Sequence, residues 1–275
     1  MEVCVDSLES AINAVKGGAQ RLELCSSLDL GGLTPSLGLL NCVRRRIPNV
    51  VAHVLIRCRD GDFLYTEDEI LVMCEDVKCL VKGGADGIVI GCLDEEGNVH
   101  IEQCNKLIET AKDFAEGRTI NITFHRAFDM TPPTFLAKTM SDIISIGCTR
   151  ILTSGQMKTA ILGKELIKDL IDQYGEQIII MPGGGLNEHN LEELLDIWSY
   201  DDSAQNGSRT ISRTNESKIT EFHASARISK QSKMKYRNEG SKMGANSEEY
   251  SIKVTSSEIV QKMVDVYKSR VHSEK

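Results

Sequence analysis

The sequence predicts a single-domain (β/α)₈ barrel of the TIM type, and three observations support this fold class. Short apolar runs alternate with stretches of helical periodicity eight times along the 275 residues. Several runs, such as 178–181, are apolar at every position, which is typical of parallel strands covered on both faces. A short glycine-containing sequence also recurs before alternate strands. We therefore expect one barrel domain spanning residues 1–275.

The expected elements follow one another in strict alternation from the first residues to the last. The expected strands are 2–5, 21–25, 50–57, 87–93, 120–126, 150–155, 177–181 and 221–226. The expected helices are 8–16, 36–46, 66–82, 101–114, 133–146, 162–174, 187–198 and 256–270. Asp68 and Glu69 early in the third helix, and Asn187 before the seventh, fit the preferences of helix N-termini.

An internal repeat supports the barrel independently of the alternation. Val-Lys-Gly-Gly-Ala occurs at 15–19 and at 81–85, before the second and fourth strands, and Ile-Gly-Cys at 146–148 precedes the sixth. The copies lie about 65 residues apart, the length of two β/α units. Glycine is the expected residue just after a helix, where the chain turns into the next strand. The copy expected before the eighth strand is missing.

Two segments depart from the barrel pattern. Residues 199–218, before the last strand, are rich in Ser, Thr and Asn without periodicity, so we expect a flexible, disordered polar insertion. Residues 227–250 form a long, basic loop after strand eight. That loop is either a solvated connection or a lid or subunit contact, and the sequence does not decide between them.

Composition excludes several classes of function. A net charge of −8 argues against nucleic acid as a partner, because phosphate binding needs a basic surface. No apolar run approaches the roughly 20 residues needed to span a bilayer. Met1 is followed directly by Glu2-Val3-Cys4-Val5, without the basic leader of a signal peptide. Nine cysteines, most of them in apolar segments, are expected to be reduced thiols. These features predict a soluble intracellular protein without membrane contact.

Chemically capable side chains gather where the expected strands end, which is the functional face of such barrels. The stretch 120–129 is the clearest case, because a β-branched run ends in His125, Arg126 and Asp129. The collected positions are Cys4, Glu23, Cys25, Arg57, Arg59, His125, Arg126, Asp129, Ser154, Gly183, Gly184, Gly185, His223, Ser225 and Arg227.

These positions divide into three groups, of which the first is a pair of thiols. Cys4 and Cys25 end neighbouring strands, and soft thiolates favour Cu(I), with Zn(II) as a competitor. Alternatively, both cysteines pack as small hydrophobic residues.

The second group could perform acid–base chemistry. His125 and His223 are each followed closely by an arginine, and neutral imidazole can ligate metal or exchange protons near neutral pH. Asp129 could orient a histidine or pair with an arginine, and Arg126 belongs to the same group of candidates. Alternatively, the histidines are hydrogen-bonded structural residues.

The third group is a candidate anion site. Gly183, Gly184 and Gly185 lie between the seventh strand and a helix, where backbone N–H groups can converge on a phosphate or carboxylate. Arg227 after strand eight and Arg57 after strand three could add positive charge. Alternatively, the glycines form a flexible turn. No expected strand ends in lysine, which argues against Schiff-base chemistry.

Many ordered motifs together make the chain similar to the CutC copper homeostasis family. The match covers Met1 to about Tyr267, apart from 199–218. The motifs are MEVCV at 1–5, RLELC at 21–25, GLTPS at 32–36, IRCR at 56–59, GDFLY at 61–65, TFHRAFD at 123–129, LTSG at 152–155, MPGGG at 181–185 and EFHASAR at 221–227. Cys58 departs from the family pattern, which has proline there.

The resemblance implies a TIM-type barrel and a role in copper tolerance or trafficking. It further implies a cytoplasmic and, in animals, also nuclear location, and a homo-oligomer (dimer or tetramer). It assigns Cu(I) binding to Cys4 and Cys25, which match the family's thiols in place. The alternative is an enzyme acting on a small anionic or phosphorylated substrate. There Gly183–Gly185, Arg57 and Arg227 would bind the anion, and His125 or His223, with Arg126 and Asp129, would do the catalysis.

Overall fold

The protein is a parallel (β/α)₈ barrel, as the sequence predicts. The computed structural model describes residues 1–197, 217–238, 240–242 and 248–271. The strands are β1 (Glu2–Val5), β2 (Arg21–Leu24), β3 (Val51–Leu55), β4 (Gly87–Ile90), β5 (Asn121–Phe124), β6 (Arg150–Thr153), β7 (Ile179–Pro182) and β8 (His223–Ala224). The helices are α1 (Leu8–Lys16), α2 (Leu37–Arg46), α3 (Glu67–Lys82), α4 (Ile101–Asp113), α5 (Leu136–Ser145), α6 (Lys164–Tyr174), α7 (Leu191–Leu195) and α8 (Ser257–Val271).

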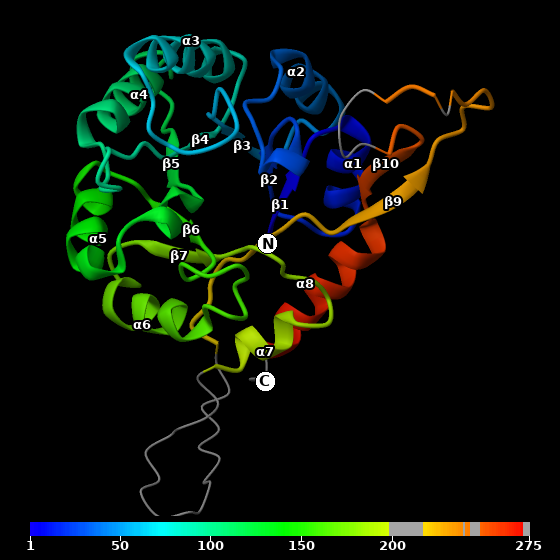
Figure 1. Cartoon of the computed structure of the whole chain (residues 1–275). Helices are drawn as coiled ribbons and strands as arrows, with labels where there is room; N and C mark the ends of the chain where they lie inside the picture. The colour runs from blue at the N-terminus through cyan, green and yellow to red at the C-terminus, as the bar shows by residue number, and fades with distance from the viewer. Residues whose placement is uncertain (198–216, 239, 243–247, 272–275) are drawn as a thin grey trace, which may run out of the picture.

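The eight strands form one sheet that curls back on itself, with the helices around it (Figure 1). Strands run in the order β7-β6-β5-β4-β3-β2-β1-β8, and the neighbouring pairs are parallel. A single parallel bridge between Gly183 and His223 connects the two ends of the sheet. β8 has two residues rather than the six expected, so this side of the barrel has the shortest backbone ladder.

Local sequence signals explain where the helices begin and end. Thr66 and Glu69 form a reciprocal capping box at the start of α3, as the acidic residues there led us to expect. The repeated glycines are confirmed as helix terminators, because Gly18, Gly84 and Gly147 have positive φ angles of 98°, 95° and 85°. Each follows the last residue of its helix or cap and reverses the chain into the next strand.

The strands divide their side chains between two environments. Val3, Leu22, Val54 and their equivalents face outward and pack with the helices in the main hydrophobic core. A second, small cluster of Cys4, Cys25, Leu55 and Val89 is separate from that core. Because alternate residues of a strand point to opposite faces, this second cluster and the polar side chains beside it lie inside the barrel.

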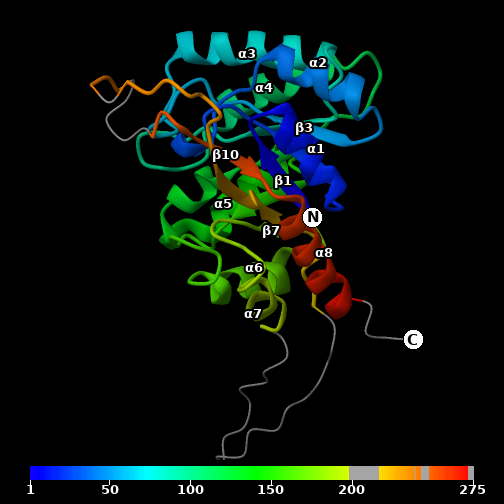
Figure 2. The same ribbon diagram turned by 90° about the vertical axis from the view of Figure 1, so that its right-hand side faces the viewer.

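The chain after strand eight differs from expectation. The segment predicted as a long loop at 227–250 begins with a strand, β9 (Arg227–Gln231), which pairs antiparallel with β10 (Ser251–Thr255). Figure 1 shows this hairpin projecting beside α1, and Figure 2 shows α8 running on from it along the barrel. Ion pairs from Arg227 and Lys253 to Asp29 attach the hairpin to the barrel rim.

Two further expectations concern regions that the structure describes only in part. The insertion predicted at 199–218 lies outside the described residues, apart from its last two positions. The seventh helix is shorter than expected, covering Leu191–Leu195 instead of 187–198. Within the described ranges, no helix has both the length and the apolar character required to cross a membrane.

Candidate functional site

A cavity of about 870 Å³ lies over the C-terminal ends of the strands, on the face where the sequence places the site. A volume of this size accommodates a small organic molecule. The predicted positions that line it are Cys4, Glu23, Arg57, His125, Arg126, Asp129, Gly184, Gly185, His223, Ser225 and Arg227. The other predicted positions, which do not line it, are Cys25, Arg59, Ser154 and Gly183.

The two predicted thiols belong to the same small cluster inside the barrel. Cys4 is 9% exposed and lines the cavity, whereas Cys25 is 1% exposed. The Cys4 thiol donates to the carbonyl oxygen of Ala224 at 3.7 Å, and the Cys25 thiol to Oε1 of Glu23 at 3.3 Å. Burial, with the neighbouring Glu23 and Cys4, raises the pKa of Cys25 well above its ordinary value. All nine cysteines are free thiols.

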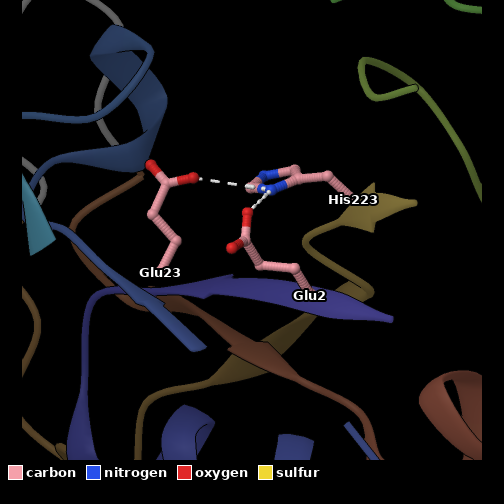
Figure 3. Close-up of side chains that lie close together, drawn as sticks. All are labelled: Glu2, Glu23 and His223. Carbon is pink, nitrogen blue, oxygen red and sulfur yellow. Dashed lines mark hydrogen bonds and ion pairs between the residues drawn. The ribbon is translucent and has the colours of Figure 1, made fainter. Parts of the chain in front are cut away.

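His223 lines the cavity and lies between two buried carboxylates. Its Nδ1 is 2.7 Å from Oε1 of Glu2 and 3.4 Å from Oε2 of Glu23 (Figure 3). Burial alone would lower the pKa of His223, but Cys4, Glu23 and Glu2 together raise it well above its usual range. Ligand atoms of Glu2, Glu23 and His223 lie within 4.8 Å of one another, so these three residues could hold a metal ion.

Charged side chains continue through the barrel interior. Arg21 pairs with Glu2 and with Glu221, and Arg150 also pairs with Glu221. Glu2 is fully buried, and its basic neighbours hold its pKa far below the ordinary value against the opposing effect of burial. Sequence reasoning did not assign Glu2 to the site. The available signal was the alternation of charged and apolar residues, as in Arg21-Leu22-Glu23-Leu24, because the alternate positions share one face.

His125 presents a polar atom without a partner. Its Nδ1 accepts a hydrogen bond from the backbone N–H of Ala127 at 3.1 Å, so the ring proton of the neutral form is on Nε2. That Nε2 is buried and has no hydrogen-bond partner among the described residues. The ring fits because Gly91 has no side chain, since a Cβ there would lie 2.4 Å from Cε1 of His125. His125 can therefore donate a hydrogen bond to a ligand in the cavity.

Asp129 and Arg126 organise a loop. Asp129 accepts hydrogen bonds from Arg126 Nε at 2.7 Å and from the backbone N–H groups of Ser154 and Gln156. Ser154 Oγ also accepts from Arg126 and donates to Asp129. Because these donors include backbone N–H groups of the turn after β6, Asp129 stabilises that turn. The arrangement agrees with the predicted pairing of Asp129 with an arginine.

The predicted anion-binding residues are already engaged within the protein. Arg57 donates to the carbonyl oxygens of Leu30, Gly32 and Gly61, which ties two loops together. Arg227 pairs with Asp29 at 3.2 Å. The backbone N–H of Gly183 donates to Thr153 O in the sheet. Gly184 and Gly185 do reach the cavity, with positive φ angles of 103° and 75°. Anion binding there stays a prediction.

Two of the buried histidines, His53 and His125, predict a weakening of the fold in mild acid. Burial lowers the pKa of His53 to about 4, and burial with Arg57 lowers that of His125 to about 3, from 6.5. Below pH 6.5 these histidines bind protons in the unfolded chain but stay neutral in the folded protein. Each of them therefore lowers the free energy of unfolding by up to about 1.4 kcal/mol for every unit by which the pH falls.

Urea unfolding between roughly pH 5 and 6.5 checks this, because over that range the unfolded histidine is mostly protonated while the folded ring stays neutral. We expect His125→Asn to have a shallower pH dependence than the wild type. His189→Asn, which changes an exposed ring, serves as the control and should reproduce the wild-type slope. Equal slopes for His125→Asn and the wild type would contradict a neutral buried His125.

Comparison with known proteins identifies the family of the chain and agrees with the fold. The sequence profile of the CutC family matches residues 1–202. The copper homeostasis protein cutC homologs of Mus musculus and Homo sapiens are each 43% identical over 257 residues, covering 93% of this chain and 84% of theirs. A crystal structure of a CutC protein from Streptococcus agalactiae superposes with a TM-score of 0.67 at 27% identity, covering 82% of this chain and 97% of that one. The chain therefore belongs to the CutC family.

Proposed function

We propose that this protein takes part in copper homeostasis and binds Cu(I) through the thiolates of Cys4 and Cys25. The names of the mouse and human relatives support the copper role. The observation that carries the ligand assignment is that both sulfurs belong to one small buried cluster, together with Leu55 and Val89. Two soft donors in an apolar setting suit Cu(I) better than a harder divalent ion.

The neighbours of the pair suggest how Cu(I) is taken up. Cys4 lines the cavity and Cys25 does not, so we infer that the ion arrives from the Cys4 side. Both thiols must lose their protons on binding, and the raised pKa of Cys25 makes this costly near neutral pH. Glu23, which accepts the hydrogen bond of the Cys25 thiol, is placed to receive that proton.

Anaerobic titration of the reduced protein with Cu(I), against a competing chromophoric chelator, tests the proposal. We expect Cys4→Ser and Cys25→Ser each to weaken binding by at least about 10–100-fold, the range seen when even an outer contact of a metal site is removed. Cys79→Ser is the matched control, because Cys79 is an exposed thiol on α3, and it should bind as the wild type does. Full Cu(I) affinity in both site variants would refute the thiolate pair.

A further inference from the structure

Three side chains from three strands converge beside the thiols, and they form a different kind of site. Glu2 comes from β1, Glu23 from β2 and His223 from β8 (Figure 3). One ligand atom from each lies within 4.8 Å of the other two. All three residues are less than 9% exposed. Two of them, Glu23 and His223, nevertheless line the cavity. The cluster is thus enclosed by protein but open on one side.

Each carboxylate is oriented by a contact through its other oxygen. Oε2 of Glu2 accepts from Arg21, which leaves Oε1 toward the imidazole. Oε1 of Glu23 accepts from the Cys25 thiol, which leaves Oε2 toward the imidazole. Outer contacts of this kind fix the direction of metal ligands in proteins. The three donor atoms therefore point to a shared space before anything binds. The proton that joins His223 Nδ1 to Glu2 Oε1 must be released when a cation binds there.

One of these atoms is left unsatisfied. Oε2 of Glu23 is buried and has no hydrogen-bond partner in the part of the chain that the structure describes, although Glu23 is only 5% exposed. A proton on His223 Nδ1 can serve Glu2 at 2.7 Å, but the 3.4 Å to Glu23 exceeds the usual length of a charge-assisted hydrogen bond, about 2.7–2.9 Å. An unpaired buried carboxylate oxygen is costly, so a further cation at this point would stabilise the site.

We propose that Glu2, Glu23 and His223 bind a divalent first-row cation of the Mn²⁺ or Zn²⁺ class, with its open coordination position facing the cavity. Two carboxylate oxygens and one imidazole nitrogen are harder donors than thiolates and favour such ions over Cu(I). Three protein ligands with one open position are the arrangement of metal sites that also bind a substrate or water. This site shares Glu23 with the Cu(I) proposal, in which that carboxylate accepts the Cys25 proton, but its three ligands include no sulfur and it does not require Cu(I).

Calorimetric titration of the reduced full-length chain with Zn²⁺ alone and with Mn²⁺ alone tests the proposal. We expect saturable binding of one equivalent, weakened at least 10–100-fold in Glu23→Gln and in His223→Gln. Glu95→Gln is the matched control, because Glu95 also lines the cavity but lies outside the cluster. Circular dichroism checks that each variant is folded. If His223→Gln does not fold, the affinity of Glu23→Gln alone decides the test.

Co²⁺ then separates this site from the thiols. We expect its visible d–d bands to appear without the near-ultraviolet charge-transfer band of a cobalt–sulfur bond, and to survive in Cys4→Ser. A strong sulfur band that disappears in Cys4→Ser would place the ion on the thiols and overturn the proposal. Failure of both Zn²⁺ and Mn²⁺ to bind, or equal binding by Glu23→Gln and the wild type, would overturn it as well. Neither result bears on Cu(I), which the cysteine variants test separately.

Discussion

Replacing Arg21 with methionine is expected to lower the free energy of unfolding by about 3–5 kcal/mol, the cost of leaving a buried charge without its partner. The Arg21 side chain is 12% exposed and pairs with both Glu2 and Glu221. Without it, the fully buried Glu2 keeps His223 at 2.7 Å and the more distant His53 at 3.8 Å, and Glu221 keeps Arg150. Methionine preserves the volume and the unbranched shape, so the lost charge dominates the effect.

Urea unfolding at neutral pH measures this difference. Lys138→Met is the matched control, since it removes the positive member of an ion pair on α5 whose lysine is 57% exposed. Exposed pairs of this kind contribute at most about 1 kcal/mol. If Arg21→Met and Lys138→Met destabilise the protein equally, the interior ion pairs do not hold the barrel together as we infer.

Replacing Gly155 with alanine is expected to destabilise the fold by about 2–5 kcal/mol, which combines the strain of a left-handed residue with that of overpacking. Gly155 has a φ of 68°, and a Cβ there would lie 2.2 Å from the backbone oxygen of Gly163. Backbone atoms cannot move aside as the end of a flexible side chain can. The neighbouring Ser154 also contacts Asp129 and Arg126, so the cavity wall would shift with the turn.

Gly147→Ala separates the two contributions. Gly147 has a φ of 85° but nothing within 4 Å of an added Cβ, so it should show the conformational strain alone, about 1–2 kcal/mol. Thermal unfolding of both variants gives the comparison. Similar losses for the two would mean that the approach of the turn at Gly155 to Gly163 is not tight.

Much of the fold could be predicted from sequence because the signals are local. The glycines after α1, α3 and α5 need positive φ angles, and the apolar strands alternate with helical periodicity. Partners across the barrel could not be predicted in this way. Glu2 contacts His223, which is 221 positions away in the sequence, and the residues next to Glu2 in the sequence do not indicate that contact. The length of β8 was also not predicted, since only two of its six expected residues pair in the barrel.

The candidate site was predictable in location but not in the use of its residues. Strand ends identify the face, so Cys4, His125 and His223 were expected there and do line the cavity. The type of a charged residue does not reveal whether other groups of the protein already bind its charge or whether it is available to a ligand. Arg57 satisfies three carbonyl oxygens, which no sequence pattern reveals, because those oxygens belong to turns.

Because β8 is short, the ion pairs inside the barrel also help to join β8 to its neighbours. Where β7 meets β8, backbone bonding is reduced to one bridge, and β8 shares only two paired positions with β1. Ion pairs cross this same region, from Glu2 to His223 and from Glu221 to Arg21 and Arg150. These ion pairs therefore add to the few backbone contacts that join β8 to its neighbours in the barrel. His223 belongs to these pairs and also lines the cavity, so a change at this residue alters the closure of the ring and the cavity wall together.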